Sequence, residues 1–74
     1  MFSEKCTLQD RDGIKRLDQV GAYLVITNRR LYEIGAARRY TLVNDTKRWV
    51  HSVHGSQLAA VVFAQKHIQA ALES

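Results

Sequence analysis

Proline is absent from the 74 residues of this chain, and cysteine occurs only once. No pyrrolidine ring therefore interrupts a helix or strand, and Cys6 has no second cysteine with which to form an internal disulfide. No Cys/His cluster has the spacing of a structural zinc site, so we expect no metal. A chain of this length predicts one domain, residues 1–74, with a small core and none of these constraints to stabilise it.

Long hydrophobic runs are also missing. The longest uninterrupted apolar segment, Leu58–Ala64, is far shorter than the roughly 20 residues that cross a bilayer. Residues 1–8 contain no signal-peptide core, and a lone cysteine suits a reducing compartment. We therefore expect a soluble, cytoplasmic protein that does not associate with membranes.

Motifs of catalysis and cofactor binding are not found either. The sequence contains no glycine-rich phosphate loop, no nucleophile elbow and no Ser-His-Asp order. A domain this small has little room for a substrate pocket of ~300 Å³ or more. We expect no catalytic residue, no cofactor and no small-molecule substrate, and hence no enzymatic activity.

Two of the three histidines, His51 and His54, are three residues apart. On a regular strand such side chains point to opposite faces, so this spacing argues against a joint metal site. We expect His51 to pack beside Trp49, and His54 to lie in the loop before the final helix.

What the chain has in excess is positive charge, and one segment contains it. Between Thr27 and Arg48 there are six basic and two acidic side chains, whereas the rest of the sequence has five of each, so the whole net charge of +4 lies in this segment. The basic residues come in three pairs: Arg29–Arg30, Arg38–Arg39 and Lys47–Arg48. Such a concentration of positive charge favours an anionic partner such as nucleic acid.

Alternation of apolar and polar residues predicts a sheet. Ala22–Thr27 is the clearest strand, because it is rich in β-branched, aromatic and aliphatic residues. Ile14–Val20 stays open between a short strand, a helical turn and a loop. Asn44 and Asp45 predict a turn that joins the last two strands into a hairpin, Tyr40–Val53. The expected strands are, in chain order, Phe2–Leu8, Ala22–Thr27, Arg30–Ile34, Arg38–Val43 and Thr46–Val53.

The final element is the most clearly marked. Gly55 breaks the preceding strand, Ser56 can cap a helix, and Gln57–Glu73 is rich in alanine. At 100° per residue this helix has two apolar sides. The side expected to cover the sheet consists of Leu58, Val61, Ala64, Ile68, Ala71 and Leu72. The nearly opposite side consists of Ala59, Ala60, Phe63, His67 and Ala70.

These elements predict an α+β fold: a small antiparallel sheet of three to five strands with one C-terminal helix packed across it. An alternative is a winged helix-turn-helix. In that interpretation Asn28 caps a recognition helix, Arg29–Arg39, and the hairpin Tyr40–Val53 is the wing.

The segment Tyr23–Ile34, YLVITNRRLYEI, resembles the strand–turn–strand in the middle of bacterial pleckstrin-homology-like domains. The resemblance covers these residues alone, and the chain is shorter than the full barrel. The expected meander closed by a C-terminal helix is similar in architecture to the small DNA-binding modules at the N-termini of some phage-type integrases. Because fold does not determine function, neither resemblance identifies a family.

The leading functional hypothesis is a small nucleic-acid-binding module, for DNA or RNA, that acts through a basic edge of the sheet. Arginine forks onto phosphates, and aromatic rings stack on unpaired bases. The residues expected to bind are Arg29, Arg30, Arg38, Arg39, Lys47 and Arg48, with Tyr32, Tyr40 and Trp49 for stacking.

The alternative hypothesis is a small protein-interaction regulator or inhibitor of the kind found on mobile elements, or a homodimer. Leaving a Phe in water costs about 1.5–3 kcal/mol relative to burial, so a partner is expected to cover the second apolar side of the final helix. The residues expected at this protein interface are Ala59, Phe63, His67 and Ala70.

Overall fold

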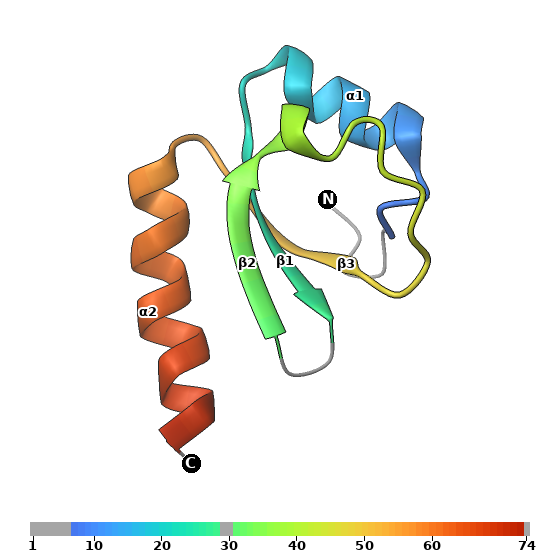
Figure 1. Cartoon of the computed structure of the whole chain (residues 1–74). Helices are drawn as coiled ribbons and strands as arrows, with labels where there is room; N and C mark the ends of the chain where they lie inside the picture. The colour runs from blue at the N-terminus through green and yellow to red at the C-terminus, as the bar shows by residue number, and fades with distance from the viewer. Residues whose placement is uncertain (1–6, 29–30, 74) are drawn as a thin grey trace.

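The computed structural model describes residues 7–28 and 31–73, with side chains as far as His67. The elements are, in order, α1 (Arg11–Gln19), β1 (Tyr23–Asn28), β2 (Leu31–Ala36), the short 3-10 helix η1 (Ala37–Arg39), β3 (Trp49–His54) and α2 (Gln57–Glu73) (Figure 1). A three-stranded antiparallel sheet with a C-terminal helix confirms the predicted small α+β fold.

β1 is the central strand, between β2 and β3, and both pairings are antiparallel. Its side chains explain this position, because Leu24, Val25 and Ile26 are each at most 1% exposed and need cover on both faces. The prediction of a central strand at Ala22–Thr27 is confirmed. β2 returns antiparallel to β1, as predicted from Arg30–Ile34.

The sheet lies between two layers (Figure 1). On one face, Leu24 and Val50 pack against Ile14 of α1. On the other face, Val25 packs against Ala60 of α2. Alternation along β1 sends its aliphatic side chains to both layers, so each helix covers one face.

The N-terminal part contains a helix for which the sequence left three interpretations open. Residues 14–19 belong to α1, whose start is capped by Asp10: its Oδ1 accepts from the backbone N–H of Gly13 at 3.1 Å. Ile14 is fully buried on the inner side of this helix. Gly21 follows with φ of 69°, a left-handed conformation that glycine adopts without strain after a helix.

The predicted first strand, Phe2–Leu8, lies outside the described residues up to position 6. At its end, Thr7 forms a single antiparallel bridge with Trp49. The backbone N–H of Leu8 donates to the carbonyl of Arg48 at 3.2 Å. The N-terminal segment therefore meets β3 where that strand begins.

The predicted strand Arg38–Val43 and the hairpin Tyr40–Val53 are wrong. The residues between η1 and β3 form neither helix nor strand, and β3 pairs with β1. The N–H of Tyr40 bonds to the carbonyl of Ala37 at 2.9 Å and turns the chain. This turn places Tyr40, 3% exposed, in the core beside Ile14. The side chain of Tyr40 thus fills the core beneath α1, and the backbone turns there instead of forming a fourth strand.

The prediction of α2 and of its cap is confirmed. The helix spans Gln57–Glu73, and Ser56 Oγ accepts from the N–H of Ala59 at 3.1 Å. The first turn of the helix is therefore anchored by a side chain, as expected for a serine at this position.

The side of α2 that covers the sheet differs from the prediction. Ala60 is buried against Val25 of β1, and Phe63 and Ala64 pack around these two residues. Leu58, by contrast, is 73% exposed. Of the predicted stripe, Ala64 faces the sheet and Leu58 does not, and the side chains of Ile68, Ala71 and Leu72 lie outside the described ones. Because this helix is apolar on nearly all sides, its periodicity alone could not select the inner one.

A β-bulge corrects the expectation for the histidines. The register of β1 with β3 shifts between Val25 and Ile26, and His51 is the extra residue on β3. As a result His51 and His54 both contact Phe63 of α2, with ring centroids 5.8 and 4.8 Å away. The predictions that these side chains point to opposite faces, and that His54 lies in a loop, are wrong.

Candidate nucleic-acid interface

The six basic residues expected to bind nucleic acid occupy different parts of the fold. The pair Arg29–Arg30 lies outside the described residues. Arg38 and Arg39 end η1 and are exposed, and Lys47 is exposed just before β3. Arg48, next to it, is half-buried.

The sheet register separates the η1 arginines from Lys47. η1 directly follows Ala36, which pairs with Tyr23 at the start of β1. Lys47 precedes Trp49, which pairs with Thr27 near the end of β1. A strand of this length extends for about 20 Å. Arg38 and Arg39 therefore lie near one end of the sheet, and Lys47 lies near the opposite end.

Arg48 is held by two carboxylates. Its Nη1 lies 2.5 Å from Oε1 of Glu33, and its Nε lies 2.9 Å from Oδ2 of Asp45. The hydrogen bond that Arg48 donates to Asp45, together with the charge of Glu33, raises the pKa of Arg48. The backbone N–H of Lys47, and then Arg48, lower the pKa of Asp45. Arg48 thus links the loop before β3 to β2. Because the two carboxylates compensate its charge and accept its N–H groups, Arg48 is poorly placed to bind a phosphate.

The three aromatic residues expected to stack on bases also differ in their surroundings. Tyr40 is a core residue whose burial raises the pKa of its hydroxyl, and the guanidinium of Arg39 lies 5.9 Å from its ring centroid. Tyr32 is half-buried on the α2 side, in edge contact with His51 at 5.6 Å. Trp49 is half-buried and is not part of the apolar packing on either face of the sheet. Trp49 is thus the aromatic ring best placed to meet a ligand.

A hollow of about 510 Å³ lies beside this tryptophan. It is lined by Asn28 at the end of β1, by Thr46 and Lys47, and by Trp49 itself. The turn before β3 is held by Asp45, whose Oδ1 accepts from the N–H of Lys47 at 2.7 Å. The sequence predicts Lys47 and Trp49 as site residues but contains no pattern that marks Asn28 or Thr46, since polar residues are common in turns.

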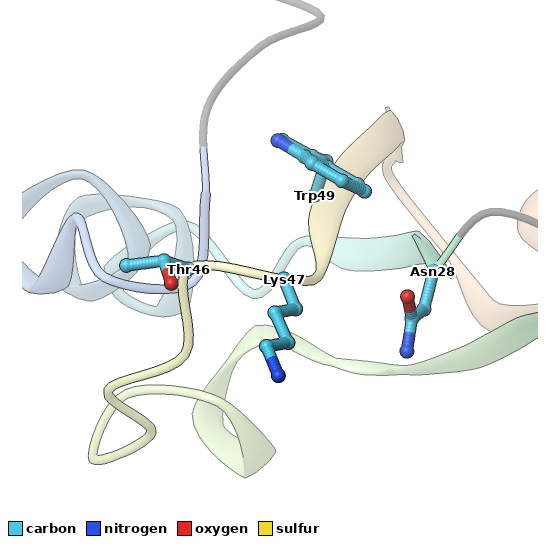
Figure 2. A pocket seen from close by; sticks show the side chains of 4 residues that line it. All are labelled: Asn28, Thr46, Lys47 and Trp49. Atoms are coloured by element: carbon cyan, nitrogen blue, oxygen red, sulfur yellow. The ribbon is translucent and has the colours of Figure 1, made fainter.

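Figure 2 shows how these side chains are arranged. The ring of Trp49 projects to one side of the chain, and the side chains of Lys47 and Asn28 extend to the other. The hollow lies at the end of the sheet, where β1 ends and β3 begins, next to the bridge between Thr7 and Trp49 on the outer side of β3. An indole face can stack on a flat ring, an ammonium attracts an anion, and a carboxamide both donates and accepts hydrogen bonds.

The residues expected at a protein interface do not share one environment. Ala59 is exposed on α2, whereas Phe63 packs toward the sheet. His67 is exposed, and the centroid of its ring lies 4.4 Å from the ring centroid of Phe63. The side chain of Ala70 lies outside the described ones. Phe63 therefore belongs to the contact between α2 and the sheet.

Comparison with known protein families, curated proteins and solved structures gives no match to this chain. Within the residues that the structure describes, no three His, Cys, Asp or Glu side chains are grouped as metal ligands would be. No helix in that part of the chain is long and apolar enough to cross a membrane. The hollow beside Trp49 and the exposed apolar side chains of α2 are the features of the described chain that bear on function.

Proposed function

We propose that this protein is a non-enzymatic module that binds an unpaired segment of DNA or RNA across the end of the sheet at Trp49, where β1 ends and β3 begins. The observation that carries the proposal is the hollow that Trp49 lines together with the exposed residues Lys47 and Asn28. The segment from Thr27 to Arg48 supplies the excess positive charge that attracts a polyanion.

The chemistry of the hollow favours unpaired nucleotides over a duplex. A base inside a duplex is stacked on both faces, so only an unpaired base can use the indole of Trp49. The side chains of Trp49 and Lys47 extend to opposite sides of the chain (Figure 2). A nucleic-acid strand that crosses this end of the sheet would bring a base to Trp49 and a phosphate to Lys47. The carboxamide of Asn28 can then bond to a base edge or a sugar.

Binding is measured by the fluorescence of Trp49, the only tryptophan in the sequence, and by anisotropy of labelled homopolymers. Quenching of the indole on addition of single-stranded oligonucleotide is expected. Trp49→Ala should weaken binding between about fivefold and a hundredfold, the range for loss of one stacked base. Trp49→Phe should retain most of the affinity, because a phenyl ring also stacks.

The electrostatic part of the interaction is tested by a matched pair of lysine variants. Lys47→Ala should reduce the salt dependence of the affinity by about 0.7 logarithmic units per logarithmic unit of salt, the value for one phosphate contact on a single strand. Lys66→Ala removes the same charge from an exposed position on α2 and should leave the slope unchanged. Absence of binding to single-stranded DNA and RNA at low salt would overturn the proposal.

A second candidate function, a protein-interaction regulator, is favoured by two side chains on α2. Leu58 is 73% exposed and Val62 is 51% exposed, and residues four apart on a helix are neighbours on its surface. A partner or a second copy of the chain would bury them. Leu58→Asp combined with Val62→Asp should abolish any self-association seen by sedimentation while leaving the circular dichroism spectrum unchanged. If the wild-type protein sediments as a monomer and binds no other protein, this candidate function is refuted.

A further inference from the structure

A second hollow, of about 310 Å³, shares Asn28 with the hollow beside Trp49. Asn28 is the last residue of β1, so the two hollows are neighbours at this end of the sheet. The residues that line the second hollow come from β1 and β2: Ile26, Asn28, Leu31, Tyr32 and Glu33. A ligand that lies beside Trp49 and extends past Asn28 therefore reaches the second hollow.

The register of the sheet explains which side chains meet in this second hollow. Asn28 pairs with Leu31, and Ile26 pairs with Glu33. Directly opposite residues of an antiparallel pair lie on the same face, and so do residues two apart on one strand. These four side chains therefore share the face on which Ile26 joins the core beneath α1.

The second hollow combines an apolar surface with a carboxylate. Leu31 is 72% exposed, so its side chain is open to a ligand that lies against it. The side chain of Glu33 is 39% exposed, so a ligand can also reach its oxygens. Apolar contact together with a few placed polar groups is typical of a ligand site. Here it suits a flat ring that has N–H groups along one edge.

The carboxylate of Glu33 is oriented by Arg48. Nη1 of Arg48 donates to Oε1 of Glu33, and Nε of Arg48 donates to Asp45 in the loop before β3. The two oxygens of a carboxylate together have about four lone-pair sites, so this hydrogen bond leaves acceptor sites for a ligand. An acceptor that is already held in place loses less freedom when a ligand binds.

We infer that the second hollow takes an unpaired guanine from the same oligonucleotide whose nearby base stacks on Trp49. This inference rests on the proposed function and names the base that the site prefers. The Watson–Crick edge of guanine presents two adjacent donors, N1–H and the 2-amino group, to the two oxygens of Glu33.

The other components of a nucleic acid match Glu33 less well. Cytosine and adenine present one amino group beside an acceptor, and thymine and uracil present one N–H between two acceptors. A carboxylate accepts hydrogen bonds and donates none, so each acceptor that faces it is unfavourable. A phosphodiester has no donor at all. Glu33 therefore selects a base over a phosphate, and guanine over the other bases.

The spacing of the strands allows one oligonucleotide to reach both hollows. β1 lies between β3, which contains Trp49, and β2, which contains Glu33. Neighbouring strands lie about 4.8 Å apart, so the two outer strands are separated by roughly 10 Å. The side chains of Trp49 and Asn28 point to opposite sides (Figure 2), so the oligonucleotide passes around the end of the sheet. Stacked nucleotides advance about 3.4 Å each, and the span therefore corresponds to a few nucleotides.

The test compares oligothymidine with the same oligonucleotide containing one central guanine, by anisotropy. The guanine should tighten binding by about fivefold to a hundredfold, the range for one bidentate base contact. Central cytosine or adenine should give a smaller gain, and hypoxanthine, which lacks the 2-amino group, should lie between guanine and thymine. The gain should not vary with salt, because a base contact releases no counterions.

The outcomes separate this inference from the proposed function. Equal affinity for the two oligonucleotides overturns the guanine site and leaves the proposed function standing. Absence of binding to either oligonucleotide overturns both. Trp49→Ala should weaken the binding of both by a similar factor and keep the ratio of their affinities.

A matched pair of variants assigns the preference to Glu33. Glu33→Gln keeps the size of the side chain but replaces one acceptor oxygen by an amide donor, and should remove most of the guanine preference. Asp45→Asn changes the other carboxylate partner of Arg48 and should keep the preference. A guanine preference that survives Glu33→Gln, or that Asp45→Asn removes to the same extent, would refute the role of Glu33.

Measurements on the wild type cover the case in which Glu33→Gln does not fold. Nuclear Overhauser contacts between the methyl groups of Leu31 and the guanine ring are expected in the complex, and contacts of Leu31 with thymines alone would overturn the inference. Guanosine monophosphate should displace the oligonucleotide poorly, because a mononucleotide cannot fill both hollows. Displacement as efficient as that by the unlabelled oligonucleotide would assign the hollow to a free nucleotide and overturn the inference.

Discussion

The two faces of the sheet are packed with different kinds of side chain. The face toward α1 is largely aliphatic, and its large side chains are fully buried: Leu8, Ile14, Leu24, Ile26 and Val50. Among the side chains that the structure describes, those buried on the face toward α2 are Val25 and Ala60, surrounded by half-buried rings such as Phe63. Burial of apolar area is the main source of folding free energy, so the α1 layer should supply most of the stability.

This difference shows where a small domain can accommodate polar or mobile elements. Stability in proteins is unevenly distributed, and segments with few buried apolar contacts open first. As far as its side chains are described, up to His67, α2 meets the sheet through the ring of Phe63 and through Ala60 and Ala64, and the histidines lie in that layer. The aliphatic layer can keep the sheet intact while the other layer changes.

The largest expected effect is that of Leu24→Ala in the α1 layer. Leu24 is 0% exposed, and removing a buried leucine side chain costs about 2–5 kcal/mol. A domain of this size has about that much stability in total, so the variant should be mostly unfolded at 37 °C. Urea unfolding followed by circular dichroism measures the loss. A cost below about 1 kcal/mol would contradict the assignment of stability to this layer.

The matching change in the α2 layer is Phe63→Ala. Because the ring is half-buried, the expected cost is about 1–2 kcal/mol, less than for full burial. The sheet should keep its hydrogen-exchange protection, while that of α2 falls. If Phe63→Ala destabilised the protein as much as Leu24→Ala, the two faces would be energetically equivalent.

A smaller effect is expected for Asp45→Asn, which breaks one ion pair of Arg48. The pKa of Asp45 is lowered in the folded protein, so its contribution to stability is present above the ordinary value of 3.8 and lost as the pH falls below it. The wild type should be slightly more stable than the variant at pH 7, and the difference should vanish near pH 2. Paired urea titrations at the two pH values measure it, and an equal difference at both would exclude the ion pair as its cause.

The smallest effect is expected for Leu58→Gln on the outer side of α2. Leu58 is 73% exposed, and substitutions of this kind usually change the free energy of unfolding by less than about 0.5 kcal/mol. Thermal unfolding of the monomer compared with that of Phe63→Ala tests which side of α2 faces the sheet. A larger loss for Leu58→Gln than for Phe63→Ala would support the predicted stripe over the observed one.

Parts of the fold and site could be predicted because their causes are local. Ser56 and the alanines after it specify α2, and the β-branched residues of Ala22–Thr27 specify a buried strand. Lys47 and Trp49 were recognisable as a basic residue beside an aromatic one. Asn28 was not, because its place in the hollow depends on the pairing of β1 with β3.

The α+β class, the central strand, the C-terminal helix and the basic middle segment can be read from the sequence, because neighbouring residues encode each of them. The pairing of β3 with β1, the burial of Tyr40 and the orientation of Phe63 toward the sheet are visible in the folded chain alone. These three depend on contacts between residues far apart in the chain. An alternating or nearly uniform apolar pattern satisfies several such arrangements locally, and the shared core selects one.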